Sequence, residues 1–135
     1  NAAAYEIGLC IAPSRIANYP ATERLSPLPM PEQEVLLLGQ TVDHVVCGLD
    51  GSPARIVAPD PRYFALHKLW LSVQTRRTQA KRPKDAAQGK ALLDAVAMHM
   101  PQFPLDDDFE SALPDMLRPH FAAWKTTRPP AARAW

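Results

Sequence analysis

The sequence has little cysteine and lacks most of the short signatures that identify an enzyme. Its two cysteines, Cys10 and Cys47, lie inside apolar runs, so no disulfide framework is expected and a reducing, cytoplasmic compartment is the default. A cysteine or histidine cluster with zinc spacing is absent, which argues against a zinc site. The sequence also lacks a P-loop, a GxSxG turn and a dinucleotide-binding glycine fingerprint.

Long apolar runs are missing as well. None approaches the length of a membrane-spanning helix, and no signal peptide is evident, so no membrane partner is expected. Of the 135 residues 47% are hydrophobic, enough for one ordinary domain or a piece of a larger one. The chain opens with Asn1 and not with Met, so we expect a segment of a longer parent protein.

The charges are unevenly distributed, although the net charge is only +1. Residues 62–90 contain eight basic residues and one acid, whereas residues 94–115 contain six acids and no lysine or arginine. A net charge close to zero argues against a uniformly basic nucleic-acid binder. The asymmetry indicates either an anion-facing surface beside an acidic one, or two helical segments that attract each other.

Strands are predicted in the first part of the chain. Residues 4–11 are rich in strand formers. Residues 43–49 and 54–58 form the strands of a predicted β-hairpin, with Asp50-Gly51 as its turn. The proline-rich connection over residues 14–31 is expected to be extended or mobile.

The remaining elements are predicted to be helical, apart from residues 34–38, which are too few to distinguish a strand from a helical turn. Asp60 is a plausible N-cap, with Pro61 at the first position of a helix over residues 61–77. Further helices are predicted over residues 83–100 and 107–125. The apolar stripe of the first helix comprises Leu66, Leu69, Trp70 and Val73.

The last predicted helix begins at Asp106-Asp107-Asp108, which we interpret as an acidic helix start and not as a metal-binding run. Pro114 and Pro119 are expected to strain or interrupt it. The pattern predicts an α+β fold in which a small mixed β-sheet (residues 1–58) precedes a helical subdomain of about three helices (59–125) and a loose tail (126–135).

Lys68 is the first candidate for chemistry. Helical geometry places it away from the apolar stripe, with Phe64 and Leu71 as neighbours. An ammonium in apolar surroundings needs an anion, which a ligand phosphate would supply if nothing in the protein provides one. The alternative is a lysine whose stem covers these neighbours while its charge reaches solvent. The adjacent His67 is expected to be a core or boundary residue bonded to the backbone.

Two polar residues of the second helix, Asp85 and Gln88, fall on a stripe that is predicted to be buried. That stripe comprises Asp85, Gln88, Leu92, Val96 and His99. A carboxylate in the first turn is stabilised by the helix dipole and would pair with Arg82 or with a basic residue of the first helix. The functional alternative is that Asp85 orients Lys68 or contacts a bound ligand.

Residues 76–84 form a basic loop. Such a charge run is either a solvated loop or a collar for the phosphates of a nucleotide or nucleic acid. The loop contains no aromatic residue, so base stacking within it is not indicated. Its cations are Arg76, Arg77, Lys81, Arg82 and Lys84.

Two segments, APDPRYFALHKL (residues 58–69) and KDAAQG (84–89), resemble a family of bacterial nucleotidyltransferase-fold proteins of largely unknown function. That family typically carries a Pro-(Glu/Asp)-Pro…Phe-Ala-x-His-Lys-Leu helix and a later Lys-Asp-(Leu/Ala)-x-Gln-Ala helix. The resemblance covers roughly residues 1–96. A looser pattern, Lys-Asp-x-x-Asp after a basic loop, is similar to abortive-infection toxin nucleotidyltransferases, but Gln88 replaces its last aspartate.

The resemblance implies the C-terminal part of a nucleotidyltransferase-like fold and assigns the acceptor chemistry to Asp85. In such a fold, Mg²⁺ held by carboxylates supports nucleotidyl transfer. Gly8 falls where the third metal-binding aspartate is expected, so Mg²⁺ is expected only in a catalytic parent and this chain alone is expected to be inactive. The other expected site residues are Lys68, Arg77, Lys81 and Lys84 at the phosphates, with His67 and Gln88 in support.

Two functions are consistent with this sequence. The first is a nucleotidyltransferase-like domain that binds a nucleoside triphosphate in its parent, with nucleic acid as a further ligand or acceptor. The second is a non-catalytic interaction module that contacts nucleic acid or an acidic protein through the 76–84 loop. A homodimer would cover a sheet edge left by missing N-terminal residues.

Overall fold

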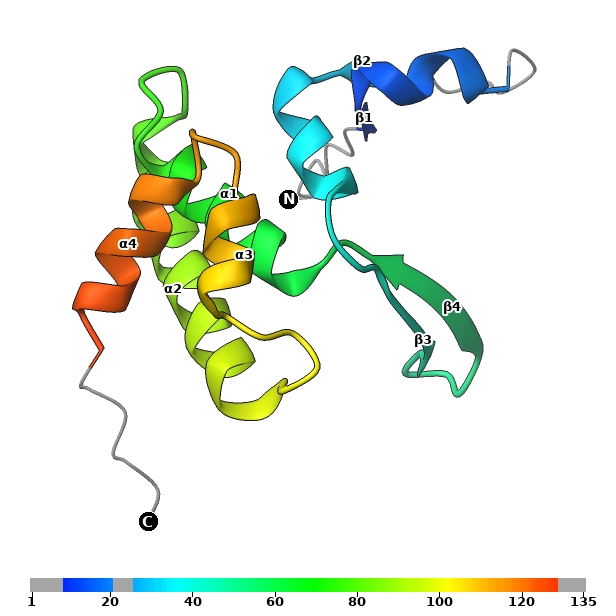
Figure 1. Ribbon diagram of the computed structural model, residues 1–135. Helices are drawn as coiled ribbons and strands as arrows, with labels where there is room; N and C mark the ends of the chain where they lie inside the picture. Colours follow the sequence, from blue (N-terminus) through cyan, green and yellow to red (C-terminus); the bar gives the residue numbers. More distant parts are fainter. Residues whose placement is uncertain (1–8, 21–25, 129–135) are drawn as a thin grey trace.

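The computed structural model describes residues 9–20 and 26–128, and it has the predicted α+β class (Figure 1). The described strands form two separate two-stranded sheets. Strands β1 (Cys10–Ile11) and β2 (Leu28–Pro29) are parallel. Strands β3 (Val42–Cys47) and β4 (Pro53–Ala58) are antiparallel.

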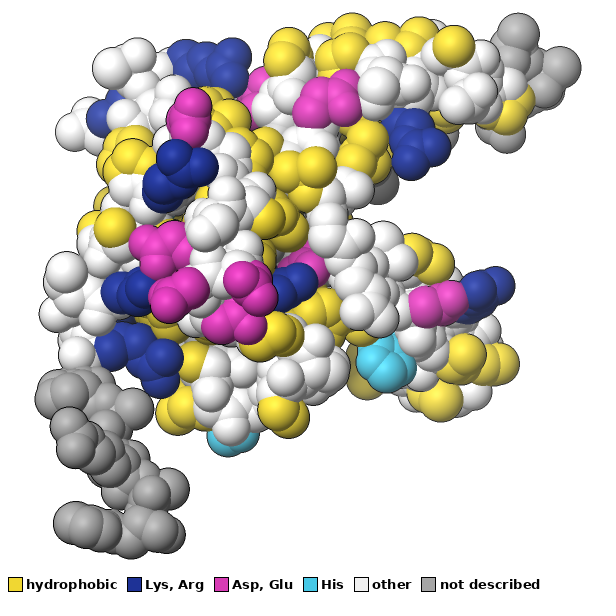
Figure 2. Space-filling view, in the orientation of Figure 1, with side chains coloured by type: hydrophobic (Ala, Val, Ile, Leu, Met, Phe, Trp, Pro, Cys, Tyr) yellow, Lys and Arg dark blue, Asp and Glu magenta, His cyan; other side chains and the backbone are white. Residues whose placement is uncertain are grey.

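The predicted hairpin is confirmed by β3 and β4. Gly51 has φ +81°, a conformation that glycine adopts without steric cost, as the turn requires. The hairpin extends away from the helices in Figure 1 and is exposed along most of its length. In Figure 2 it and the N-terminal segment are two arms separated by a notch, and each carries apolar side chains on its surface.

Short 3₁₀-helices replace parts of the predicted extended connection. Helix η1 (Pro13–Asn18) covers the start of the connection predicted to be extended or mobile, so that prediction is wrong there, whereas strand β2 is extended as predicted. Helix η2 (Pro31–Leu37) shows that the ambiguous run is a helical turn. Of the strand predicted over residues 4–11, residues 4–8 lie outside the described part of the chain.

Helix α1 (Pro61–Ser72) begins as predicted. Asp60 is its N-cap and accepts a hydrogen bond from the Arg62 amide at 2.9 Å. The helix ends five residues before the predicted residue 77. In the segment that follows it, the Arg82 guanidinium donates to the carbonyl oxygens of Gln74 and Thr75 at 2.7 and 2.9 Å. Val73 therefore lies past the helix and is 59% exposed, so its place on the buried stripe is a wrong prediction.

Helix α2 (Arg82–His99) confirms the second predicted helix and packs along α1. A Cβ atom added at Gly89 would lie 2.8 Å from the Ala65 carbonyl oxygen of α1. The absence of a side chain at Gly89 thus allows the two helices to approach closely. Between α1 and α2 lies the short 3₁₀-helix η3 (Gln79–Lys81).

The helix predicted over residues 107–125 is interrupted, and two helices take its place. Helix α3 (Asp107–Ala112) starts at Asp106, whose carboxylate caps the Phe109 amide at 2.9 Å. The chain breaks at Pro114 because proline lacks the amide hydrogen that a helix interior needs. Helix α4 (Arg118–Thr126) then carries Pro119 in its first turn, where proline is tolerated.

The hydrophobic core lies among the four α-helices. Its largest fully buried apolar side chains are Leu66, Leu93, Leu117 and Phe121. The rings of Phe109 and Phe121 pack edge-to-face, with 5.5 Å between their centroids. Val35 of helix η2 is also part of this core. None of the helices in the described segments is both long and apolar enough to cross a membrane.

Candidate functional site

Asp85 is a buried carboxylate that binds two cations. It lies in the first turn of α2 and is 2% exposed. The Lys68 ammonium of α1 donates to its Oδ1 at 3.0 Å, and the Arg77 Nε donates to its Oδ2 at 2.7 Å. One carboxylate therefore fixes a lysine of α1 and an arginine of the following loop.

Burial and pairing act in opposite directions on the Asp85 carboxyl. Burial disfavours its charged form, but the hydrogen bonds from Arg77 and Lys68, and their positive charges, outweigh burial and hold the pKa of Asp85 below its usual range. The carboxylate is therefore ionised at neutral pH, as the two cations require.

The basic loop is anchored by Arg82. Its guanidinium donates to the carbonyl oxygens of Gln74, Thr75 and Arg77. Arg82 therefore does not pair with Asp85, as one of our two predictions had it. Asp85 pairs instead with Arg77, and with Lys68, a basic residue of the first helix as the other prediction had it. The segment from Gln74 to Arg77 is consequently held by hydrogen bonds from the Arg82 side chain.

Helix α2 buries a different stripe from the predicted one. Gln88 and His99 are exposed, and the prediction that Gln88 is buried is wrong. The helix is rotated so that Gly89 meets Ala65 of α1, which turns Gln88 outward. The buried residues of α2 are Asp85, Gly89, Leu93 and Val96.

A cavity of about 290 Å³ opens beside this ion-pair cluster. Four of its lining side chains are cations and one is the carboxylate of Asp85. In the part of the chain that the structure describes, Lys81 and Lys84 are exposed and form no ion pair. The structure thus brings together every site residue that we predicted except His67. The lining residues are Lys68, Arg77, Lys81, Lys84, Asp85 and Gln88.

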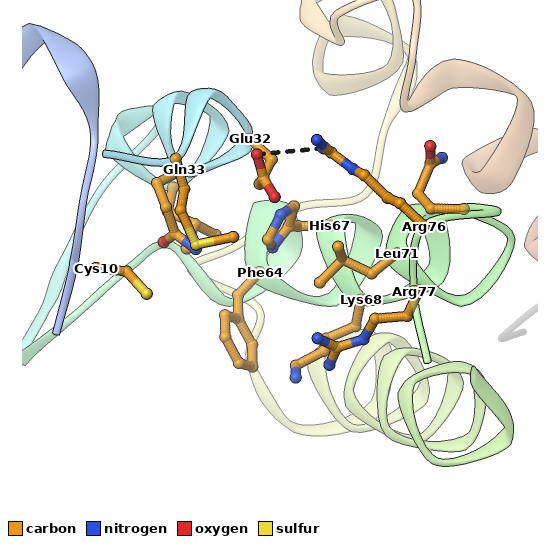
Figure 3. A pocket seen from close by; sticks show the side chains of 12 residues that line it. Cys10, Glu32, Gln33, Phe64, His67, Lys68, Leu71, Arg76 and Arg77 are labelled. Carbon is orange, nitrogen blue, oxygen red and sulfur yellow. Dashed lines mark ion pairs between the residues drawn. The ribbon is translucent and has the colours of Figure 1, made fainter. Parts of the chain in front are cut away.

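His67 lines a second cavity, of about 440 Å³, which shares Lys68 and Arg77 with the first (Figure 3). The histidine is 2% exposed, and its ring stacks on that of Trp70 with 5.9 Å between the ring centroids, so it is a core residue, as expected. The hydrogen bond to the backbone that we also expected of it is not found among the described residues. Its Nε2 atom, however, has no hydrogen-bond partner in the structure. Burial, and to a smaller extent the positive charge of Lys68, lowers the pKa of His67, so the ring is neutral at neutral pH.

The sequence did not reveal the opposite wall of this second cavity. Glu32 of η2 is buried there and forms an ion pair with the exposed Arg76 guanidinium, with 3.2 Å between Oε2 and Nη2. Figure 3 shows Glu32 beside His67, with Phe64 on the other side of the ring. Glu32 lies 35 residues before His67 in a segment without periodicity, so no spacing pattern connects the two.

The described residues do not fit a Mg²⁺ ion. Among residues 9–20 and 26–128, no group of three or more His, Cys, Asp or Glu side chains could hold a metal. Both carboxylate oxygens of Asp85 are already bound by cations, whereas Mg²⁺ requires oxygen ligands of its own. Gly8, where the resemblance placed a metal-binding aspartate, lies outside the described residues.

Comparison with known proteins identifies the family. A nucleotidyltransferase family model matches residues 12–114, well over half of the 135 residues, and this range contains the whole lining of the smaller cavity. No curated protein and no solved structure matches the chain. The chain therefore belongs to a nucleotidyltransferase family.

Proposed function

We propose that the cavity beside Asp85 binds the phosphates of a nucleoside triphosphate. The observation that carries this proposal is the concentration of four cations, from α1, the basic loop and α2, around a single cavity. Asp85 neutralises only part of their charge, which leaves a surplus for a polyanion. Membership of a nucleotidyltransferase family makes a triphosphate the natural choice of anion.

Within this site Asp85 acts as a positioning residue. Both of its oxygens are engaged, so it cannot also serve as a base for an acceptor without releasing Lys68 or Arg77. An ammonium has three donors and a guanidinium five. Lys68 and Arg77 therefore keep free N–H groups for phosphate oxygens while Asp85 fixes their direction.

Lys81 and Lys84 provide the mobile part of the site. They are exposed, and their long side chains can adapt to the phosphates after the nucleotide has entered. Because the described residues lack a Mg²⁺ site, we limit the proposal to nucleotide binding and assign no transfer step to this chain.

The test is the affinity of the chain for nucleoside triphosphates, measured by calorimetry and by thermal unfolding. A ligand at about 100 times its Kd should stabilise the fold by about 2.7 kcal/mol. Lys84→Ala should weaken binding about five- to tenfold, because it removes one charge-assisted contact. Lys90→Ala is the matched control, since Lys90 is an exposed lysine of the same helix outside this cavity. Equal binding by the two variants would contradict the proposal.

The alternative function is distinguished by the affinity of the chain for nucleic acid, measured by the same calorimetry at several salt concentrations. If the 76–84 loop contacts nucleic acid, binding should fall steeply with salt and should not depend on the presence of a triphosphate. The Arg82 guanidinium donates to three backbone carbonyls, which leaves one cation of the loop fewer for this mode.

A further inference from the structure

The geometry points to a nucleoside pocket: we infer that the 440 Å³ cavity holds the base and sugar of the bound nucleotide, with His67 Nε2 as a hydrogen-bond partner of that nucleoside. The inference rests on the proposed function, because it takes the phosphates to lie in the adjoining cationic cavity. It adds the site of the nucleoside half and the residue that recognises it.

The first argument is the shared wall. Lys68 and Arg77 line both cavities, and in Figure 3 their charged ends lie together at one side of the larger one. A ligand whose polyanionic end contacts these two groups from the cationic cavity can extend its other end past them. A nucleotide has this division, with charge at one end and an uncharged ring system at the other.

The second argument is the chemistry of the larger cavity. Ligand pockets are mostly apolar, with a few polar groups that fix orientation. Phe64, Leu36 and Leu71 supply apolar surface, and the Phe64 ring is a surface on which a base can stack. Gln33 supplies an amide group that can donate to and accept from the edges of a base, and Gln74, whose Nε2 donates to the Trp70 carbonyl, supplies an amide oxygen that can accept.

The third argument is the unpaired nitrogen. A buried polar atom without a partner is costly, and native structures contain few of them. His67 Nε2 is such an atom among the described residues, and its residue lines this cavity; because the atom is covered from solvent, the side chains around it must shift for a ligand to reach it. A neutral imidazole has one donor and one acceptor nitrogen, so Nε2 can bond a hydroxyl group or a base edge in either tautomer.

The test compares nucleoside triphosphates with inorganic tripolyphosphate, which has the charge but no nucleoside. The wild-type chain should bind the nucleotide at least about tenfold more tightly than tripolyphosphate. His67→Phe keeps an aromatic ring against Trp70 but removes Nε2, so it should lower nucleotide affinity about tenfold. It should leave the affinity for tripolyphosphate unchanged. Lys84→Ala should weaken both ligands.

These outcomes separate the two proposals. Equal affinity of the wild-type chain for both ligands, or full nucleotide affinity in His67→Phe while Lys84→Ala is impaired, would overturn the nucleoside pocket and leave the phosphate site intact. Loss of all binding in the wild-type chain would overturn the phosphate site itself.

A second measurement does not depend on the variant folding. The NMR signals of the His67 imidazole should shift with a nucleoside triphosphate and remain in place with tripolyphosphate. Identical responses to the two ligands would contradict the inference.

Discussion

The cluster of Lys68, Arg77 and Asp85 explains how a carboxylate remains charged in a nearly dry position. Removing an ion from water is expensive, and a buried pair is stable only if its geometry and hydrogen bonds compensate. Asp85 receives two charge-assisted bonds from cations that are themselves partly exposed, at 21% and 29% of their side-chain surface. The cations therefore keep part of their hydration, which reduces the cost of the cluster.

Replacing Asp85 with asparagine should destabilise the chain, because it leaves two cations facing each other without a counter-charge. We expect a loss of about 2–4 kcal/mol in the free energy of unfolding, measured by urea denaturation. Asp115→Asn is the control: this carboxylate is 95% exposed and, among the described residues, pairs with Arg118 alone, so the change should stay within about 0.5 kcal/mol.

The contribution of Asp85 to stability should also depend on pH. Its pKa in the folded chain lies below the ordinary value of 3.8, so its stabilisation is complete above that value and is lost as the pH falls through the lower, folded-state pKa. The stability difference between the wild-type chain and Asp85→Asn should therefore be largest near neutral pH and shrink below about pH 4. A difference that stays constant down to pH 2.5 would contradict an ionised, cation-bound Asp85.

At the scale of single residues, the sequence predicted part of the two cavity linings correctly and missed other residues. Helical spacing placed Lys68 away from the apolar stripe and Asp85 on a buried face, and the two residues meet. It misplaced Gln88, because a period of about 100° per residue does not fix the rotation of a helix about its axis. Gly89 contains that information, since the closest helix–helix contact occurs where a side chain is missing. Glu32 was missed because its contact with Arg76 spans 44 residues.

At the scale of elements, prolines and capping residues determined most boundaries correctly. Asp60 and Pro61 start α1, Asp106 starts α3, and Pro114 separates α3 from α4. The end of α1 was not predictable from the local sequence, because residues 72–82 contain no proline or glycine that would mark it.

Gly89→Ala should destabilise the α1–α2 pair although alanine is the better helix former. The new methyl group would meet the Ala65 carbonyl oxygen at 2.8 Å, and a backbone atom cannot move aside cheaply. We expect a net loss of about 1–2 kcal/mol, since overpacking costs more than the roughly 1 kcal/mol that helix propensity returns. Thermal unfolding measures it.

The control is an alanine-to-glycine substitution at an exposed position of α2, which measures the effect of helix propensity without a contact to α1. Ala91 is exposed in α2, so Ala91→Gly should lose about 1 kcal/mol from helix propensity alone. If Gly89→Ala instead raised the unfolding temperature, the close approach of the two helices would be refuted.

At the scale of the whole molecule, helix α4 belongs to the core although the family match ends at residue 114. Phe121 is fully buried, and Trp124 donates from its indole to Asp94 of α2 at 2.9 Å. The cationic cavity is formed by α1, α2 and the loop between them, and the two helices contribute residues to this core. The integrity of the site therefore depends on residues beyond the matched region.

Phe121→Ala should cost about 3–5 kcal/mol of unfolding free energy, because it leaves a cavity in the centre of the core. Met98→Ala is the comparison, since Met98 is 65% exposed and should change stability by less than about 0.5 kcal/mol. The tryptophan fluorescence of the chain reports both transitions. A small effect of Phe121→Ala would show that α4 is dispensable for the core.

The central claim, a triphosphate site beside Asp85, is tested most directly by labelling the chain with a nucleotide acyl phosphate. This reagent transfers its acyl group to lysines next to bound phosphates, and mass spectrometry identifies the modified residue. We predict labelling of Lys81 and Lys84, which line the cavity, and its suppression by excess unmodified nucleoside triphosphate. Equal labelling of Lys90 and Lys125, unaffected by competing nucleotide, would contradict the account.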